Sequence, residues 1–169
     1  ACGNTVVVKP SEETPTTTAL LGEVMKEAGV PDGVFNVVQG YGGDSAGAFL
    51  TAHPDVDGYT FTGETRTGEL IMQNAAKGVR DISLELGGKN AGIVFADCDL
   101  DKAIEGTMRS AFANCGQVCL GTERVYVERS IFDEFVSRLK AEAETLVIGP
   151  PDDATANLGP LISQKQQKK

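Results

Sequence analysis

The sequence is poor in the residues that build metal sites and membrane segments. It has one histidine and no tryptophan, and its four cysteines, Cys2, Cys98, Cys115 and Cys119, lack the paired spacing of zinc ligands, so we expect no bound metal. It also has no run of roughly 20 apolar residues and no signal-peptide pattern at its start. Free thiols without these signals favour a cytoplasmic protein.

Positive charge is also scarce. Fifteen basic residues against 24 acidic ones give a net charge of −9 at pH 7. This balance disfavours nucleic acid and anionic membranes as partners. A modest acidic excess is otherwise typical of a soluble protein.

The chain has enough apolar residues for a folded core, with 41% of its 169 positions in the hydrophobic set. Strand-like and helix-like segments alternate along it. The expected strands are 5–8, 34–38, 59–62, 82–85, 92–95 and 124–127, and the expected helices are 11–28, 45–51, 64–76, from 99 or 101 to 113, and one from about 130. This order predicts an α/β fold with an open, mainly parallel sheet flanked by helices, in which ligands bind at the carboxyl ends of the strands.

Helix-start signals accompany two of these segments. Ser11 is expected to cap the first helix, with Glu12 and Glu13 in its first turn. Ser130 and Asp133 resemble a capping box for the last helix, and Ile131, Phe135 and Leu139 recur on one of its faces. The segment after that helix, GPPDDATANLGPLI, is expected to be loop.

Two glycine-rich motifs carry the chemistry. LELGGKN contains Glu85 and FANCGQVCLGTERV contains Cys119, 34 residues later. A carboxylate can act as a general base and a thiolate as a nucleophile, and the flanking glycines allow the backbone to approach a substrate closely.

Taken in order, VVVKPSEETP, GYGGDSAG, FTGE, LELGGKN and NCGQVCLGTERV resemble the central part of an NAD(P)-dependent aldehyde dehydrogenase, from about Gly3 to Ser163. The residues around Cys119 further resemble the hydroxymuconic semialdehyde dehydrogenases of aromatic-compound breakdown. This resemblance implies a Rossmann-like fold and an internal fragment that is inactive alone, because the family's oxyanion-holding asparagine and its later glutamate-phenylalanine segment are not in the chain. It implies that residues 1–87 belong to the dinucleotide-binding domain and residues 88–169 begin the catalytic domain. It also implies a full-length homodimer or homotetramer.

The resemblance assigns Cys119 as the nucleophile and Glu85 as the general base that activates water for thioester hydrolysis. Two simpler roles stay open, a buried inert thiol for Cys119 and a solvated strand-end acid for Glu85. Cys115 and Cys119 could instead form a redox pair, although a C-x-x-x-C spacing is not that of thioredoxin-like sites. Asn114 is expected to shape the cysteine loop.

The resemblance also implies a cofactor site. Lys9 and Glu12 would meet the adenosine ribose, and a carboxylate at Glu12 favours NAD over NADP because it repels a 2′-phosphate; Glu12 could equally serve as a first-turn helix acid. Gly40, Gly63, Glu64 and Leu86 complete the expected cofactor-binding set, and Glu64 stands where the family has a serine. His53 is expected to be a surface or helix-end residue. Lys89 and Arg124 are expected to be salt-bridging scaffold residues, and a contact with the cofactor or with another subunit stays open for both.

Three functions therefore compete. The parent protein oxidises a small aldehyde to a carboxylate with NAD, the chain is a non-catalytic nucleotide-binding or assembly fragment, or it is a thiol redox module. Aldehyde-dependent NADH formation separates them.

Overall fold

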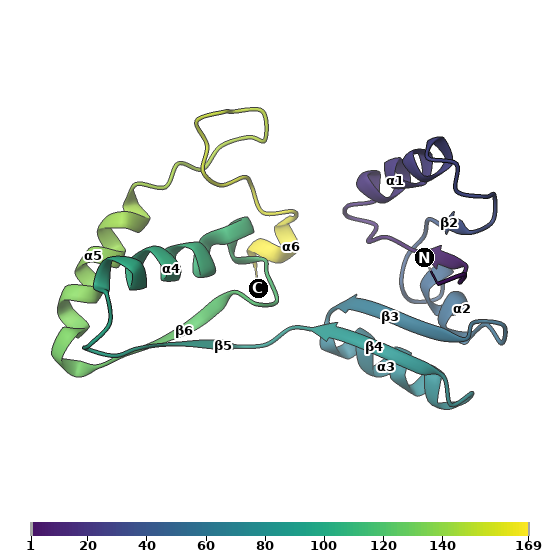
Figure 1. Cartoon of the computed structure of the whole chain (residues 1–169), viewed down its shortest axis with the longest axis horizontal. Helices are drawn as coiled ribbons and strands as arrows, with labels where there is room; N and C mark the ends of the chain where they lie inside the picture. The colour runs from purple at the N-terminus through teal and green to yellow at the C-terminus, as the bar shows by residue number, and fades with distance from the viewer. Residues whose placement is uncertain (1, 169) are drawn as a thin grey trace. The chain divides into compact units, whose positions relative to one another are not determined.

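The computed structural model describes residues 2–168, which divide into two compact units between Leu84 and Glu85. We call these the N-terminal unit and the C-terminal unit, and each is described by itself (Figure 1). Strand β4, Asp81–Leu86, crosses the division.

The N-terminal unit contains two strand pairs and three helices. Strands β1 (Val6–Val8) and β2 (Phe35–Val37) pair in parallel, and α1 (Thr16–Glu27) connects them. The remaining elements are α2 (Ala46–Ala52), β3 (Gly58–Gly63), α3 (Thr65–Ala76) and β4, and β3 pairs with β4. The chain connections alternate between strand and helix, as expected for this class.

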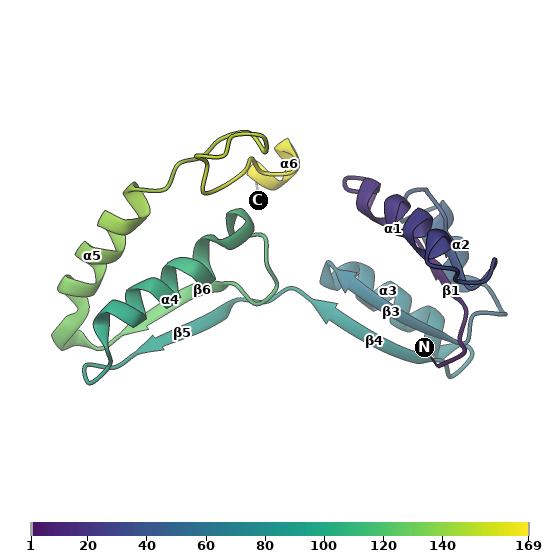
Figure 2. The same ribbon diagram turned by 45° about the horizontal axis from the view of Figure 1, so that its top comes forward.

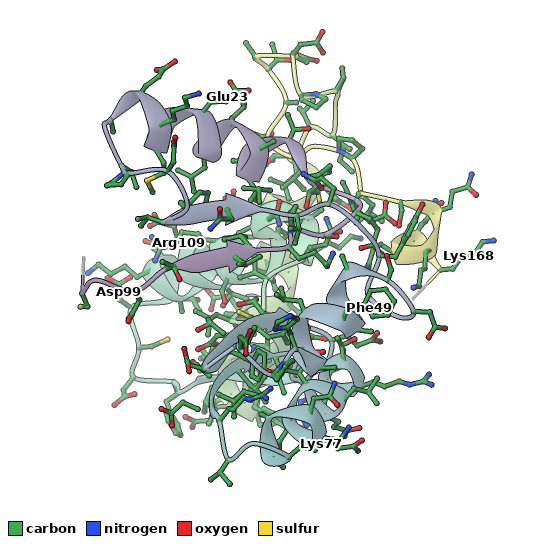
Figure 3. The ribbon with its side chains drawn as sticks, turned by 90° about the vertical axis from the view of Figure 1, so that its right-hand side faces the viewer. Glu23, Phe49, Lys77, Asp99, Arg109 and Lys168 are labelled. Atoms are coloured by element: carbon green, nitrogen blue, oxygen red, sulfur yellow. The ribbon has the colours of Figure 1, made fainter. Side chains whose placement is uncertain are left out.

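Burial in the N-terminal unit is concentrated on α3, where Ile71 and Ala75 are buried. No residue of α1 or α2 is buried. Phe49 of α2 is 68% exposed, and it is labelled in Figure 3 together with Glu23 on the solvent side of α1.

The expected start of the first helix is wrong by about one turn. The segment from Ser11 to Thr14 forms a turn in which the amide of Thr14 donates to the carbonyl of Ser11 over 3.1 Å, and α1 begins at Thr16. Pro15 explains the shift, because a residue that precedes proline avoids the helical conformation, whereas proline itself is tolerated at a helix start. Glu12 is therefore not a first-turn acid of α1.

The C-terminal unit is a parallel strand pair covered by two helices. Strands β5 (Asn90–Val94) and β6 (Thr122–Val127) pair in parallel, with α4 (Leu100–Phe112) and a short 3₁₀ turn, η1 (Ala113–Gly116), between them. A second 3₁₀ turn, η2 (Arg129–Ile131), leads into α5 (Phe132–Glu144), and α6 (Gln164–Gln167) lies near the end of the chain. Figures 1 and 2 show α4 running along one face of the β5–β6 pair.

The core of this unit joins the β5–β6 strand pair with the helices α4 and α5. Val94 of β5, Ile104 of α4 and Phe135 of α5 form one buried cluster, and Phe135 is only 1% exposed. Ile131 and Leu139 pack against the same cluster, which confirms the apolar face expected from their four-residue spacing.

The expected capping box at the start of α5 is wrong. The residue at the cap position is Ile131, and no side chain caps the helix. The hydroxyl of Ser130 instead donates to Glu128 over 3.4 Å, because the η2 turn moves the helix start two residues beyond Ser130.

The α/β class with parallel sheets flanked by helices is confirmed, and the strands of residues 2–168 pair in three two-stranded sheets. Two details of the last segment were not predicted, a parallel bridge between Ile148 and Leu158 and the helix α6. None of the helices within residues 2–168 is long and apolar enough to cross a membrane.

Candidate functional site

The loop that carries Cys119 begins with an unusual backbone. Asn114, Cys115 and Gly116 have φ values of 51°, 59° and 74°, so three consecutive residues are left-handed. Only glycine adopts this conformation without a steric cost, although asparagine tolerates it better than most residues. The side chain of Asn114 donates to the carbonyl of Gln117 over 3.2 Å and the amide of Gln117 returns a bond of 3.1 Å to Asn114, so Asn114 closes this turn locally.

Cys119 lies in a second tight turn and is exposed. The amide of Gly121 donates to the carbonyl of Val118 over 2.9 Å and closes the turn around it. The side-chain amide of Asn90 donates to the carbonyl of Cys119 over 2.6 Å and to that of Gly121 over 3.0 Å. The burial that the alternative of an inert thiol assumed is therefore not found for Cys119 in this chain.

Asn90 was missed as a site residue by sequence reasoning. It ends the LELGGKN motif, but a contact between a side chain and distant main-chain carbonyls leaves no periodicity or spacing that a single sequence reveals. The only available signal is that a polar amide occupies the first position of an expected strand.

The thiol of Cys115 has a different environment from that of Cys119. Its Sγ donates to the carbonyl of Gly159 over 2.9 Å, and both cysteines are free. Cys115 thus ties the cysteine loop to the segment around Gly159, and the geometry gives it a scaffold contact rather than a bond to Cys119.

Glu85 is exposed on β4, one residue before the strand ends at Leu86. Residues along β4 alternate between exposed and partly buried, and Glu85 shares the exposed face with Asp81 and Ser83. The partial burial expected for a general base is therefore not present in this chain.

The segment between Glu85 and the cysteine loop is anchored to β6. The Nε and Nη2 atoms of Arg124 donate to the carbonyl of Lys89 over 3.1 and 2.7 Å, and Lys89 forms an ion pair with Glu123. Lys89 and Arg124 thus have the scaffold role expected for them. Chain connectivity alone keeps the Cα of Glu85 within about 18 Å of that of Asn90, whose side chain bonds to Cys119.

Three of the expected cofactor residues come together in the N-terminal unit. The Nζ atom of Lys9 donates to the carbonyl of Gly40 over 2.9 Å, also bonds the carbonyl of Pro10, and lies 3.7 Å from Oε2 of Glu12. Lys9 follows β1 and Gly40 follows β2, so this Lys9 cluster (Lys9, Glu12 and Gly40) lies at the carboxyl ends of two parallel strands, where ligands of such sheets bind. The side chain of Lys9 is 15% exposed and that of Glu12 is 46% exposed, so the carboxylate remains accessible.

Position 40 requires a glycine, because a larger residue would clash with its neighbours. Its φ is +152°, and a Cβ at this position would lie 2.8 Å from the Cβ of Ala46. The following turn is closed by a bond of 3.1 Å from the amide of Tyr41 to the hydroxyl of Ser45. An ammonium, a carboxylate and a side-chain-free turn side by side fit the hydroxyls of a dinucleotide ribose, which need both donors and acceptors.

The other three expected cofactor residues lie on other strand ends. Gly63 ends β3, and the carbonyl of Glu64 accepts bonds of 3.0 and 3.1 Å from the amides of Thr67 and Gly68 at the start of α3. Leu86 ends β4 and is partly buried.

Comparisons with known proteins agree with one another. The sequence profile of the "Aldehyde dehydrogenase family" matches residues 1–169. The chain is 79% identical to a 2-hydroxymuconic semialdehyde dehydrogenase of Pseudomonas putida over all of its length and 35% of that protein. It therefore spans about a third of the length of the curated relatives it matches.

Solved structures give the same result. An NADP-dependent enzyme of Escherichia coli superposes with a TM-score of 0.92 at 44% identity, over 95% of this chain and 33% of that one. A betaine aldehyde dehydrogenase double mutant from Staphylococcus aureus, in complex with NAD⁺, superposes with a TM-score of 0.91 at 39% identity, over 97% of this chain and 32% of that one.

Proposed function

The chain belongs to the aldehyde dehydrogenase family, and from that premise we propose that the full-length protein oxidises an aldehyde to a carboxylate with a nicotinamide adenine dinucleotide. The observation that supports this most directly is the exposed Cys119 in a turn whose main chain is bonded from outside the turn. An accessible sulfur with a fixed backbone suits a nucleophile, because the attacking atom must be both reachable and oriented.

In the proposed reaction, the thiolate of Cys119 attacks the aldehyde carbon and forms a thiohemiacetal. The bound dinucleotide supplies the oxidising step by accepting a hydride. What remains on Cys119 is a thioester, whose carbonyl carbon is open to attack by water.

Glu85 is proposed to remove the proton from that water. A carboxylate at the end of a strand, followed by Gly87 and Gly88, has little steric hindrance around it. Attack of the hydroxide on the thioester then releases the carboxylate product and regenerates the Cys119 thiolate.

The Lys9 cluster is proposed to bind the adenosine ribose of the dinucleotide. Glu12 favours NAD over NADP in this proposal, because its exposed carboxylate would repel a 2′-phosphate. The Lys9 ammonium 3.7 Å away weakens that repulsion, so we expect a preference rather than exclusion.

We also propose an unsaturated semialdehyde as the substrate and the cytoplasm as the location. The 79% identity to a 2-hydroxymuconic semialdehyde dehydrogenase supports the substrate class. The two compact units would correspond to part of a dinucleotide-binding domain and the start of a catalytic domain, with the boundary near Gly87. A homodimer or homotetramer is proposed for the full-length protein from family resemblance.

The test uses the full-length protein with a semialdehyde and with NAD or NADP. Cys119→Ala should abolish NADH formation, whereas Cys98→Ala, which alters a cysteine packed against the core of the same unit, should retain it. Glu85→Gln should slow turnover more than the first burst of NADH, because only thioester hydrolysis needs the base. NADH formation that persists in Cys119→Ala would reject the proposed nucleophile, and loss of burst and turnover together in Glu85→Gln would reject the proposed base. Thiol–disulfide exchange that is lost in both Cys115→Ser and Cys119→Ala, with no aldehyde-dependent NADH formation in the wild-type protein, would favour the redox alternative.

A further inference from the structure

The side chain of Asn90 bridges two carbonyls on either side of Leu120. Its Nδ2 atom donates over 2.6 Å to Cys119 and over 3.0 Å to Gly121. Asn90 is the first residue of β5, and the strand register shifts between it and Ala91, so the side chain lies at an irregularity of the ladder. Both hydrogens of the amide can thus be used on the turn that presents the thiol.

We propose that Asn90 is a positioning residue for Cys119, an inference that rests on the proposed nucleophilic role of that cysteine. A peptide unit is planar, so holding the carbonyl of Cys119 fixes the peptide plane that follows its Cα. The second bond fixes the carbonyl of Gly121, two residues after Cys119. The direction of the Cys119 side chain is then set from outside its own turn.

The opposite side of the turn is held by other groups. The amide of Thr122 donates to the hydroxyl of Ser110 on α4 over 3.1 Å. A Cβ at Gly121 would lie 3.1 Å from the carbonyl of Val118 and 3.2 Å from that of Ser110, so the turn fits closely against α4. Asn90 supplies the contact at Cys119 itself.

Asn90 also satisfies two main-chain acceptors of this turn. Removal of its amide leaves the carbonyls of Cys119 and Gly121 without the donor that holds them, so the turn loses its attachment to β5.

Gly88, three residues after Glu85, lies against the side chain of Asn90. A Cβ at Gly88 would lie 3.2 Å from Oδ1 of Asn90, so the absence of a side chain at Gly88 leaves room for the Asn90 amide. The segment that carries the proposed base therefore also carries the residue that orients the proposed nucleophile.

The test measures thiol chemistry, which needs neither aldehyde nor cofactor. In the full-length protein, the rate of alkylation of Cys119 by iodoacetamide is followed from pH 5 to 10, with the modified residue located by peptide mass spectrometry. Asn90→Ala should lower the rate at pH 7 about tenfold and alter the pH profile of the reaction, because the turn that presents the thiol is no longer held. Asn90→Asp, which has the same shape but a charged acceptor in place of the donor, should lower the rate at least as much.

Asn36 offers a matched control in the N-terminal unit. Its Nδ2 atom also bridges two carbonyls, those of Val6 and Gly33, over 3.2 and 2.8 Å. Asn36→Ala should leave both the alkylation rate of Cys119 and its pH midpoint unchanged, whatever it does to stability. Equal changes in the Asn36 and Asn90 variants would overturn the proposal, because the effect would then be global.

Gly88→Ala provides an independent variant that leaves Asn90 in place, and it should lower the alkylation rate in the same direction by displacing the amide. An unchanged rate and midpoint in the folded Asn90→Ala and Gly88→Ala variants would overturn the positioning role. Failure of the proposed function has a different signature, since wild-type protein would then form no NADH from any semialdehyde while its alkylation profile could still be measured.

Discussion

The two candidate sites of this chain differ in the groups that they present. In the Lys9 cluster, charged side-chain groups face one another at two strand ends, with Nζ of Lys9 between the carbonyl of Gly40 and the carboxylate of Glu12. In the cysteine loop, side chains bond to main-chain carbonyls, as Asn90 does to Cys119 and Cys115 does to Gly159. The first arrangement presents donors and acceptors to a ligand, and the second fixes the backbone from which one reactive atom projects.

This difference suits the two proposed roles. A ribose is recognised by several hydrogen bonds, and each contributes only part of the binding free energy, so each of them tolerates some movement. A nucleophile must meet one carbon atom in one direction, and a misplacement of about 1 Å can cost about 10²-fold in rate. We therefore expect the cysteine loop to depend on residues that never touch the substrate.

The cores of the two units differ as well. The C-terminal unit has a cluster that joins strand and helices around Phe135, whereas the buried residues of the N-terminal unit lie mainly on α3, with Pro10 outside it. Phe135 is the only large side chain among residues 2–168 that is fully buried.

The largest effect on stability is therefore expected from Phe135→Ala. Loss of this ring should lower the free energy of unfolding by about 3–5 kcal/mol, because it removes apolar contacts and leaves a cavity. Urea denaturation of the full-length protein, followed by circular dichroism, measures the change.

Phe132→Ala is the matched control for that substitution, because Phe132 lies on the same helix but is 41% exposed. Its effect should be clearly smaller. Equal losses for the two variants would show that the Val94, Ile104 and Phe135 cluster does not dominate the stability of this unit.

The features that depend on residue type and spacing could be predicted from the sequence. The apolar face of α5 follows from the spacing of Ile131, Phe135 and Leu139, and the alternation of strands and helices indicates the α/β class. Lys9, Glu12 and Gly40 were expected from resemblance to border the cofactor; the structure brings the three residues together, and their binding of a cofactor stays a prediction.

The features that depend on backbone geometry could not be predicted. The left-handed conformations of Asn114 and Cys115 occur where Asn114 bonds locally to Gln117 and Cys115 bonds to Gly159, 44 positions away, and neither residue type requires them. The start of α1 was misplaced because the capping signal of Ser11 was given more weight than the constraint of Pro15 on the residue before it. The bridge from Asn90 to Cys119 joins residues 29 positions apart and leaves no local pattern.

A smaller effect is expected at the Lys9 cluster. Lys9→Met keeps the length of the side chain but removes its charge and its donors, so the dissociation constant for NAD should rise about tenfold. Calorimetric titration of the full-length protein measures it. The alkylation rate of Cys119 should not change, which would separate the two sites experimentally.

Lys26→Met serves as the control for that variant, since Lys26 is an exposed lysine on α1 of the same unit. It should change the dissociation constant less than twofold. Wild-type affinity in Lys9→Met would remove Lys9 from the proposed cofactor site.

The smallest effect is expected at the start of α4, and it also distinguishes the two units. Asp99, labelled in Figure 3, accepts a bond from the amide of Lys102 over 3.2 Å and an ion pair from its ammonium over 2.9 Å, whereas α1, α2 and α3 of the N-terminal unit have no side-chain cap. The side-chain bond from Lys102 is the main cause that lowers the pKa of Asp99 below its ordinary value of 3.8, and the Lys102 amide adds to it.

Because the folded state holds this carboxylate ionised at a lower pH than the unfolded chain does, the contact stabilises the fold above about pH 4, and the contribution declines as the pH falls through the lowered pKa. The difference in unfolding free energy between wild type and Asp99→Asn should thus be constant from pH 5 to 7 and shrink below pH 4. In a Lys102→Met background this pH dependence should weaken, because the largest cause of the shift is gone. A difference that stays constant down to pH 2 would show that the cap acts through its shape alone, as an asparagine also could, and that the charge of Asp99 does not contribute to the stability of α4.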